Sequence, residues 1–305
     1  MGIVILLIVI LLVLAALIAV STYIAHTAAF GKRQTMEDSW DWQMAHEPDA
    51  RFLKKEDFQD YVVKSYDGYE LHAAFLPAKK ETDRYVILCH GYTDTRYGMI
   101  KYLRFFHALD VHCVIYDERG HGENLRCPCS FGIREAKDLM VMIEDTYKRY
   151  GENLRLGMLG ESLGGATVLT ALQYNPKVAF VVDDCGFSDI VPVLKDGVRK
   201  NHLPGGMVYL ASFMAKLLYG ASFTAARPVA AVKGNRIPLL IMHGAEDDFI
   251  LPFHSEAVKA ATEGYVELHL FPGAGHAGSA IVSPEEYARL LKQFLLNISF
   301  LTEET

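Results

Sequence analysis

A serine flanked by two glycines, placed directly after an apolar run, constrains this chain more than any other feature. The sequence Gly160-Glu161-Ser162-Leu163-Gly164 follows the apolar run Leu154–Leu159 and opens a helix-like run, Leu163–Tyr174. A serine on a tight strand-to-helix turn projects its hydroxyl beyond the edge of a sheet, and only glycine lets the two backbones pass closely enough on either side. This context makes Ser162 a candidate nucleophile.

An acid and a histidine follow Ser162 along the chain, each just after another apolar run. The run Leu239–Met242 leads into His243-Gly244-Ala245-Glu246-Asp247-Asp248, and the run Val266–Leu270 leads into Pro272-Gly273-Ala274-Gly275-His276. A serine hydroxyl is a poor nucleophile at neutral pH, so it needs an imidazole to take its proton and a carboxylate to orient that imidazole. We therefore predict that His276 is the general base and that Asp247 holds it.

The spacing of the apolar runs predicts an α/β fold. Two strand candidates, Val62–Tyr66 and Glu70–Leu76, flank the turn pair Asp67-Gly68 and predict an antiparallel hairpin. Short apolar runs then alternate with helix-length segments, at Tyr85–Cys89, Val111–Tyr116, Leu154–Leu159, Val178–Val182, Leu239–Met242 and Val266–Leu270. Strands buried on both faces that alternate with helices form a mostly parallel, doubly wound sheet.

A long segment interrupts this alternation between Val182 and Leu239. It contains two helix-like runs, Phe187–Val198 and Met207–Leu218. We predict that residues 187–236 form a helical lid, because insertions at the C-terminal edge of an open α/β sheet lie where ligands bind. The alternative is ordinary packing of these helices against the sheet.

The first thirty residues have the composition of a membrane span. No polar residue occurs from Ile3 to Val20, and the apolar character continues to Ile24. At about 1.5 Å per helical residue, such a run crosses the roughly 30 Å hydrocarbon core of a bilayer, and it is longer than the apolar part of a signal peptide. We predict that residues 1–31 are a single-pass anchor. The alternative is a signal sequence cleaved near Thr27-Ala28-Ala29.

Charge indicates how the rest of the chain is placed and what it does not bind. Lys32 and Arg33 follow the span and no basic residue precedes it, which favours a globular part facing the cytoplasm over the extracytoplasmic face. Residues 1–31 carry no Asp, Glu, Lys or Arg, so the net charge of −7 belongs to the remainder. A mildly acidic chain without a long basic run lacks the footprint of a nucleic-acid-binding protein. Residues 32–60, rich in charge, are expected to connect the anchor to one domain over 61–305.

Metal and cofactor motifs are missing from the sequence. The twelve histidines form no H-E-x-x-H pair, and Gly160–Gly165 has neither the Walker lysine nor the dinucleotide spacing. The five cysteines are an odd number, and Cys127-Pro128-Cys129 lacks both a second pair and the C-x-x-C spacing. We therefore expect no metal, no cofactor and no disulfide framework.

Taken together, the motifs resemble those of the α/β-hydrolase superfamily over about residues 60–298. They are His90-Gly91-Tyr92, Asp117-x-Arg119-Gly120-His121-Gly122, the Gly-x-Ser-x-Gly of Ser162, the His-Gly-x-x-Asp of Asp247, and Gly275-His276. Within the superfamily the chain is similar to membrane-anchored bacterial hydrolases described as serine-aminopeptidase-like or Bem46-like. The resemblance implies an oxyanion hole made by the backbone N–H groups of Tyr92 and Leu163, whose fixed dipoles would stabilise the developing oxyanion.

The acid is the position at which the sequence departs from this family. Its members often carry His-Gly-x-x-Asp-x-x-Val-Pro, whereas Asp247-Asp248-Phe249-Ile250-Leu251-Pro252 has one extra residue. Asp248 therefore remains an alternative to Asp247. Asp184 is a second alternative, because some relatives of this fold place the acid after the preceding strand.

These features predict a serine hydrolase that cleaves carboxylic esters or related acyl bonds of a small-molecule substrate through an acyl-enzyme on Ser162. Fold and triad do not choose the leaving group, so a serine peptidase and a lipase or thioesterase at the membrane remain alternatives. A peptidase of the aminopeptidase kind would need acids in the lid to bind an amino terminus, and the acids there are Asp189 and Asp196. A non-catalytic scaffold that binds a lipid or a protein is the alternative from another class.

Overall fold

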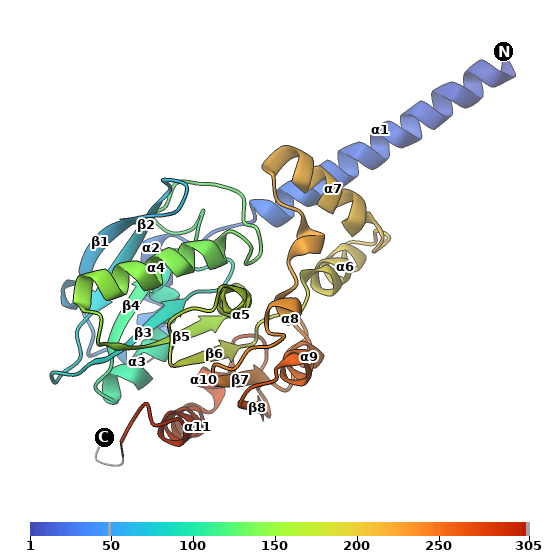
Figure 1. Cartoon of the computed structure of the whole chain (residues 1–305). Coiled ribbons are helices and arrows are strands. Elements are labelled where there is room, and N and C mark those ends of the chain that lie inside the picture. The colour runs from blue at the N-terminus through green and yellow to red at the C-terminus, as the bar shows by residue number, and fades with distance from the viewer. Residues whose placement is uncertain (48–49, 303–305) are drawn as a thin grey trace.

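The sheet of this protein is mostly parallel, with an antiparallel hairpin at one edge, as the sequence predicts. The structure is a computed structural model that describes residues 1–47 and 50–302. Residues 48–49 of the expected connector and residues 303–305 of the expected domain lie outside the described residues. The described residues form an eight-stranded sheet in the order β1-β2-β4-β3-β5-β6-β7-β8 (Figure 1). Its strands are β1 (Gln59–Lys64), β2 (Glu70–Leu76), β3 (Arg84–Cys89), β4 (His112–Tyr116), β5 (Arg155–Glu161), β6 (Phe180–Asp184), β7 (Leu239–Gly244) and β8 (Val266–Phe271).

Strands β3 to β8 are parallel, whereas β2 is antiparallel to both β1 and β4. The prediction of a mostly parallel, doubly wound sheet is therefore confirmed. The helices that connect or follow its strands are α3 (Ile100–Ala108), α4 (Glu135–Tyr150), α5 (Leu163–Ala171), α9 (Phe253–Ala261), α10 (Ser279–Val282) and α11 (Pro284–Asn297), with short 3-10 turns η3 (Arg96–Met99) and η4 (Leu172–Tyr174).

The first hairpin forms as predicted, but its first strand is displaced toward the N-terminus. Strand β1 ends at Lys64 and not at Tyr66. The reason is that Ser65 already belongs to the turn, since its N–H donates to Tyr69 O at 2.8 Å and its carbonyl accepts from Gly68 N at 2.9 Å. Asp67 Oδ1 accepts from Tyr69 N and closes the same turn.

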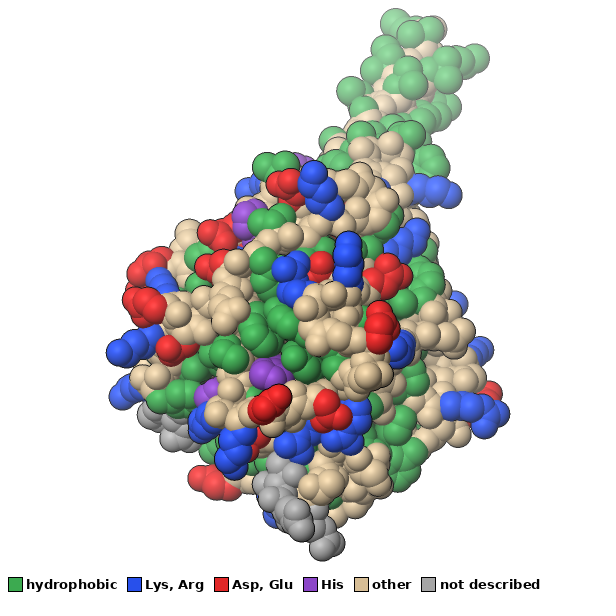
Figure 2. Space-filling model, turned by 60° about the vertical axis from the view of Figure 1, so that its left-hand side comes forward, with side chains coloured by type: hydrophobic (Ala, Val, Ile, Leu, Met, Phe, Trp, Pro, Cys, Tyr) green, Lys and Arg blue, Asp and Glu red, His purple; other side chains and the backbone are tan. Residues whose placement is uncertain are grey.

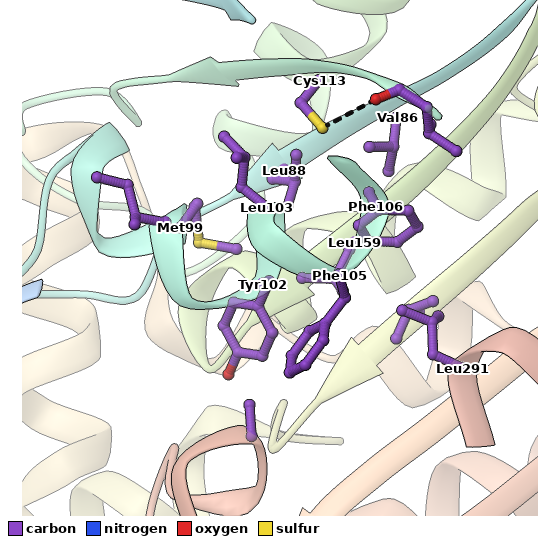
Figure 3. Packing of buried hydrophobic residues seen from close by; sticks show 14 of the residues in the cluster. Val86, Leu88, Met99, Tyr102, Leu103, Phe105, Phe106, Cys113, Leu159 and Leu291 are labelled. Atoms are coloured by element: carbon purple, nitrogen blue, oxygen red, sulfur yellow. Dashed lines mark hydrogen bonds between the residues drawn. The ribbon is translucent and has the colours of Figure 1, made fainter. Parts of the chain in front are cut away.

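The core has two parts, one on each face of the sheet, because successive residues of a strand point to opposite faces. Val86 and Leu88 of β3 pack with Leu103 and Phe106 of α3, as Figure 3 shows, in the cluster that also holds residues of α11. The alternate residues of β3 lie in the second cluster, with side chains of α4 and α5. Strands β3 to β7 are thus covered on both faces, as their apolar runs require, whereas the edge strand β8 is half-buried.

The N-terminal helix α1 (Gly2–Ala29) divides into a free part and a docked part. Every residue from Gly2 to Ala19 is exposed, and this part stands clear of the domain, whose surface mixes acidic and basic side chains (Figure 2). Ile24, Ala25 and Ala29, by contrast, are buried against the domain. Among the described residues, α1 is the one helix long and apolar enough to cross a membrane, a property that signal sequences share.

Helices also fill the segment between β6 and β7, where the lid is expected. They are α6 (Ile190–Lys200), α7 (Met207–Tyr219), the 3-10 turn η5 (Phe223–Ala225) and α8 (Pro228–Ala231). Helix α7 packs against the docked part of α1 (Figure 1).

The connector contains α2 (Met36–His46) and the 3-10 turn η2 (Lys55–Asp57). Trp40 of α2 packs edge-on against Tyr97, with ring centroids 5.0 Å apart, so this tryptophan is a packing residue.

Candidate active site

Ser162 lies on a strained turn between β5 and α5. Its φ and ψ are +54° and −108°, a conformation that L-residues rarely adopt. The glycines of the motif permit the turn, because a Cβ at Gly160 would overlap the carbonyl oxygen of Gly164, and a Cβ at Gly164 would overlap that of Cys89. Ser162 stands at the N-cap position of α5, yet its side chain makes no capping hydrogen bond. Its hydroxyl is therefore available for another partner.

That partner is His276, in the loop after β8. His276 Nε2 lies 3.0 Å from Ser162 Oγ, and its Nδ1 lies 2.7 Å from Asp247 Oδ2. The structure thus joins the three side chains that the sequence singled out into one hydrogen-bonded chain. The loop that holds the imidazole also contains Ala277, at φ +56°. With Nδ1–H donating to the carboxylate, Nε2 faces the serine with its lone pair, the tautomer that proton removal from the hydroxyl requires.

Asp247 is buried and accepts hydrogen bonds on both carboxylate oxygens. Oδ1 accepts from the backbone N–H groups of Phe249 and Ile250, both at 2.9 Å. Oδ2 lies 2.7 Å from His276 Nδ1 and 3.1 Å from His243 Nε2. Burial alone would raise the pKa of Asp247, but the hydrogen bonds from His243 and His276 hold it well below its ordinary value. The acid therefore stays ionised at neutral pH.

Of the three candidate acids, Asp247 is the one that hydrogen-bonds to His276. Asp184 ends β6 in a buried setting that raises its pKa to about 6, with Glu161 adding to the effect and Lys101 opposing it. Asp248 follows Asp247 but is exposed, and the hydrogen bond to His276 comes from Asp247.

The expected oxyanion-hole residues both line the cavity in front of Ser162. Leu163 is the first residue of α5, where helical N–H groups have no partner within the helix. Tyr92 follows the His90-Gly91 turn, which passes close to the serine: a Cβ added to Gly91 would lie 3.7 Å from Ser162 Cβ. His90 fixes this turn, because its Nδ1 lies 2.7 Å from Gly91 O and its Nε2 accepts from Glu118 N at 2.8 Å. His121 contacts the carbonyl of Tyr92 from the other side.

A buried ion pair behind the serine was missed by sequence reasoning. Glu161, which precedes the serine, is buried and pairs with Lys101 of α3. Lys101 Nζ also lies 3.3 Å from the carbonyl oxygen of Ala277, next to His276, and Tyr102 donates to Glu161 at 2.7 Å. The pair thus connects the serine turn to the histidine loop. Burial opposes the charge of Lys101, but Glu161 outweighs it and raises the pKa of the lysine.

One group of potential metal ligands overlaps this site. Within the described residues, Cys185, Asp247 and His276 bring ligand atoms within 4.8 Å of one another. Two of these residues, Asp247 and His276, already belong to the hydrogen-bonded chain that leads to Ser162. Burial raises the pKa of the Cys185 thiol well above its ordinary value, which disfavours the thiolate that metals bind.

An apolar cavity of about 130 Å³ opens at Ser162. Its walls come from the turns that contain Tyr92 and Leu163, from the segment between β6 and β7, and from α1. The residues that line it are Thr27, Ala28, Tyr92, Phe131, Ser162, Leu163, Phe187, Ile190, Val193, Leu194, Phe249 and Ile250. A substrate group held at Ser162 would therefore be surrounded by apolar side chains of the protein.

The sequence is similar to a known protein family and to several individual proteins. Residues 80–184 match the family model of serine aminopeptidase, S33. The chain is 26% identical to the YqkD protein of Bacillus subtilis over 304 residues, 98% of this chain and 99% of that protein. It is 26% identical to the alpha/beta hydrolase domain-containing protein WAV2 of Arabidopsis thaliana over 253 residues, 78% of each.

Solved structures give the same fold. The esterase Pf2001 of Pyrococcus furiosus matches with a TM-score of 0.64 at 21% identity, over 80% of this chain and 96% of the esterase. Family model, relatives and fold agree, and this chain is accordingly a member of the α/β-hydrolase superfamily.

Proposed function

We propose that this protein is a serine hydrolase that cleaves carboxylic esters or related acyl bonds through an acyl-enzyme on Ser162. The observation that carries the proposal is the hydrogen-bonded chain from Ser162 Oγ through the imidazole of His276 to the buried carboxylate of Asp247. A serine, a base and an orienting acid in this geometry are what acyl transfer to serine requires.

Each residue has a defined step in the proposed reaction. His276 Nε2 takes the proton as Ser162 Oγ attacks the carbonyl carbon, and Asp247 stabilises the imidazolium that forms. The N–H groups of Tyr92 and Leu163 donate to the oxyanion of the tetrahedral intermediate. His276 then returns the proton to the leaving oxygen, which leaves the acyl group on Ser162. Water, activated by the same imidazole, releases the acid in the second half of the cycle.

The lid favours an ester over a peptide. The family model bears the description serine aminopeptidase, and a peptide's amino terminus would need a free acid near the cavity. Both acids of the lid are paired: Asp189 Oδ2 lies 3.1 Å from Arg227 Nε, and Asp196 Oδ1 lies 3.0 Å from Arg199 Nη1. Asp189 Oδ1 also caps α6 by accepting from Val191 N. Serine peptidase activity is therefore the second candidate.

We also propose that α1 anchors the protein in a membrane. Its exposed part, residues 2–19, would measure about 27 Å as a helix, close to the roughly 30 Å of a bilayer core. Lys32 is exposed directly after the helix and favours a domain on the cytoplasmic side.

Hydrolysis of p-nitrophenyl esters of increasing chain length tests the proposed function. The wild type should turn over at least one ester, with a burst of p-nitrophenol if deacylation limits the rate, and Ser162→Ala should lose at least about a thousandfold in kcat. A matched control is Ser283→Ala, which changes a serine before α11, outside the cavity. A folded wild type that hydrolyses no ester and does not react with fluorophosphonates would instead support a non-catalytic scaffold.

A further inference from the structure

The last turns of α1 form part of the wall of the cavity at Ser162. Thr27 and Ala28 line that cavity together with Val193 and Leu194 of α6. The same four residues, with Phe249, also line a second hollow of about 390 Å³, which lies between α1 and α6. Because the two hollows share these walls, they are adjacent, and together we call them the groove.

The groove continues along α1 toward the exposed apolar part of the helix. Beyond Ala28 it is lined by Ile24 and Tyr23, and on the opposite side by Gly197 and Val198 of α6. From Ala28 to Tyr23 the helix rises by about 7.5 Å. The first cavity is smaller than the roughly 300–1,000 Å³ of typical ligand pockets, whereas the second hollow falls in that range. A substrate longer than a short acyl group would extend along α1.

Several contacts hold this end of α1 in place. The hydroxyl of Tyr92 donates to the carbonyl of Ala28 and accepts from Gly31 N at 3.0 Å. This one side chain therefore connects the end of α1 to the His90-Gly91 turn. The carbonyl of Ala29 accepts from Cys129 N at 3.0 Å. His26 Nδ1 lies 3.0 Å from the hydroxyl of Tyr219, at the end of α7. The wall that α1 contributes is therefore fixed to the domain.

Helix α7 adds an exposed apolar face beside α1. Tyr209, Phe213 and Leu217 are 53%, 61% and 68% exposed and recur every four residues, so they share one side of the helix. The opposite side, with Ala211 and Ala215, is buried in the cluster that contains Ile24 and Ala25 of α1. An exposed apolar helix face of this kind, next to an apolar helix that leaves the domain, is suited to lie against a bilayer.

We propose that the groove between α1 and α6 binds the acyl chain of an amphiphilic ester that resides in the membrane, so that α1 is a wall of the substrate site as well as an anchor. This inference rests on the proposed hydrolase function, because it places the ester carbonyl at Ser162. The apolar chain would run from Ser162 past Ala28 toward Tyr23, and the ester would reach the serine from the bilayer in which α1 and the exposed face of α7 lie.

Blocking the groove at Gly197 tests the proposal. A Cβ added to Gly197 meets no atom within 4 Å, so the side chain of Gly197→Phe starts in free space at the wall of the groove. Gly206→Phe is the matched control: Gly206 has the same free space, lies in the same insertion between α6 and α7, and lines neither hollow. Full-length proteins are reconstituted in phosphatidylcholine vesicles, and kcat/KM is measured for the palmitate and butyrate esters of 4-methylumbelliferone.

The expected result is that Gly197→Phe lowers the palmitate-to-butyrate ratio of kcat/KM at least tenfold, equivalent to about 1.4 kcal/mol, whereas Gly206→Phe changes it less than twofold. Palmitate ester placed in the same vesicles as the enzyme should be hydrolysed faster than ester supplied in separate vesicles. An unchanged ratio in Gly197→Phe overturns the assignment of the groove, and equal rates from both vesicle populations overturn delivery from the bilayer.

A binding measurement separates this inference from the proposed catalysis. Dansyl-undecanoic acid is titrated into Ser162→Ala and into its double variants with Gly197→Phe and Gly206→Phe. The groove predicts a Kd at least tenfold higher in the Gly197→Phe double variant alone, whether or not the wild type hydrolyses esters. Equal binding by all three proteins contradicts the groove, while loss of turnover and labelling in the wild type contradicts only the hydrolase function. Circular dichroism of each variant checks that it is folded.

Discussion

Asp247 makes more hydrogen bonds than the orientation of one histidine requires. A second histidine, His243, lies beside it, with Nε2 3.1 Å from Asp247 Oδ2 and 2.7 Å from the carbonyl oxygen of Ile250. His243 Nδ1 in turn lies 2.6 Å from Ser255 Oγ. These contacts hold the carboxylate in place independently of His276. The proposed triad is therefore part of a larger hydrogen-bond network, of which the sequence motif shows only Asp247.

We predict that Asp247→Asn lowers kcat by about a thousandfold to ten-thousandfold, because an amide in place of the carboxylate no longer stabilises the imidazolium or the correct tautomer. Asp184→Asn and Asp248→Asn should each change kcat less than tenfold, since the hydrogen bond to His276 comes from Asp247. Steady-state kinetics with a p-nitrophenyl ester check this. A larger loss of kcat in Asp184→Asn or Asp248→Asn would instead assign the role of the triad acid to that residue.

Asp183 predicts how stability depends on pH. This residue of β6 is buried, and burial raises its pKa to about 7, with His243 opposing the effect and Asp184 adding to it. Between about pH 4 and 7 the folded protein keeps this proton while the unfolded chain has lost it, so the contribution to stability falls as pH rises.

Asp183→Asn removes this dependence, and the amide oxygen can still accept from Gly186 N as Asp183 Oδ1 does at 3.0 Å. The free energy of unfolding of the variant, relative to that of the wild type, should therefore increase by roughly 1–3 kcal/mol when the pH is raised from 4.5 to 7.5. Urea unfolding at both pH values measures the difference. A difference that stays constant with pH contradicts the assignment.

At the residue scale, what the sequence could predict was limited to side chains inside local motifs. Ser162 and His276 each come after an apolar run, Ser162 between two glycines and His276 directly after Gly275, so their positions could be read from the sequence. Lys101 gave no such signal, because its partner Glu161 is sixty residues away and the ion pair exists only after α3 packs against β5.

Among the elements, α5 depends most strongly on its glycines. A Cβ at Gly164 would overlap the backbone of Cys89 in β3, which cannot move without disturbing the sheet. We predict that Gly164→Ala destabilises the fold by about 2 kcal/mol or more, as overpacking of a core does. Chemical denaturation followed by circular dichroism measures the change.

Gly197→Ala is the matched control, because this glycine also lies inside a helix but has free space around its Cβ position. It should stabilise α6 by roughly 0.5–1 kcal/mol, since alanine is the better helix former. Equal effects of the two substitutions would show that close packing at Gly164 is not what the turn requires.

Strand positions were more predictable than the course of α1. Each strand of the parallel part coincides with a predicted apolar run, because a strand covered on both faces has few polar residues. In α1, by contrast, the apolar composition is nearly uniform from Ile3 to Ile24. Composition therefore could not separate residues 2–19, which are exposed, from the turns around Ile24 and Ala25 that pack on α7.

At the scale of the whole molecule, the docked end of α1 ties the proposed anchor to the proposed active site. Arg33, just after the helix, lies over the ring of Tyr92 with its guanidinium carbon 4.3 Å from the ring centroid. Tyr92 therefore contacts the connector, α1 and the cavity at once. The domain should consequently be held close to the membrane surface, with the groove on the side of α1.

The orientation that we propose places the domain in the cytoplasm, because Lys32 and Arg33 follow the helix. Protease added to spheroplasts that express the full chain should leave the domain intact, and detergent should make it susceptible. Digestion without detergent would place the domain on the outer face, and release of a soluble domain cut near Ala29 would identify α1 as a cleaved signal sequence.

The central claim is that Ser162 is a nucleophile activated by His276. Intact-protein and peptide mass spectrometry after reaction of the full-length protein with a fluorophosphonate tests it most directly, with Ser162→Ala and His276→Ala treated in parallel. We predict a single adduct on the peptide that contains Ser162 in the wild type, none in Ser162→Ala, and labelling slowed at least a hundredfold in His276→Ala. An adduct on another serine, or equal labelling of the wild type and Ser162→Ala, would contradict the claim.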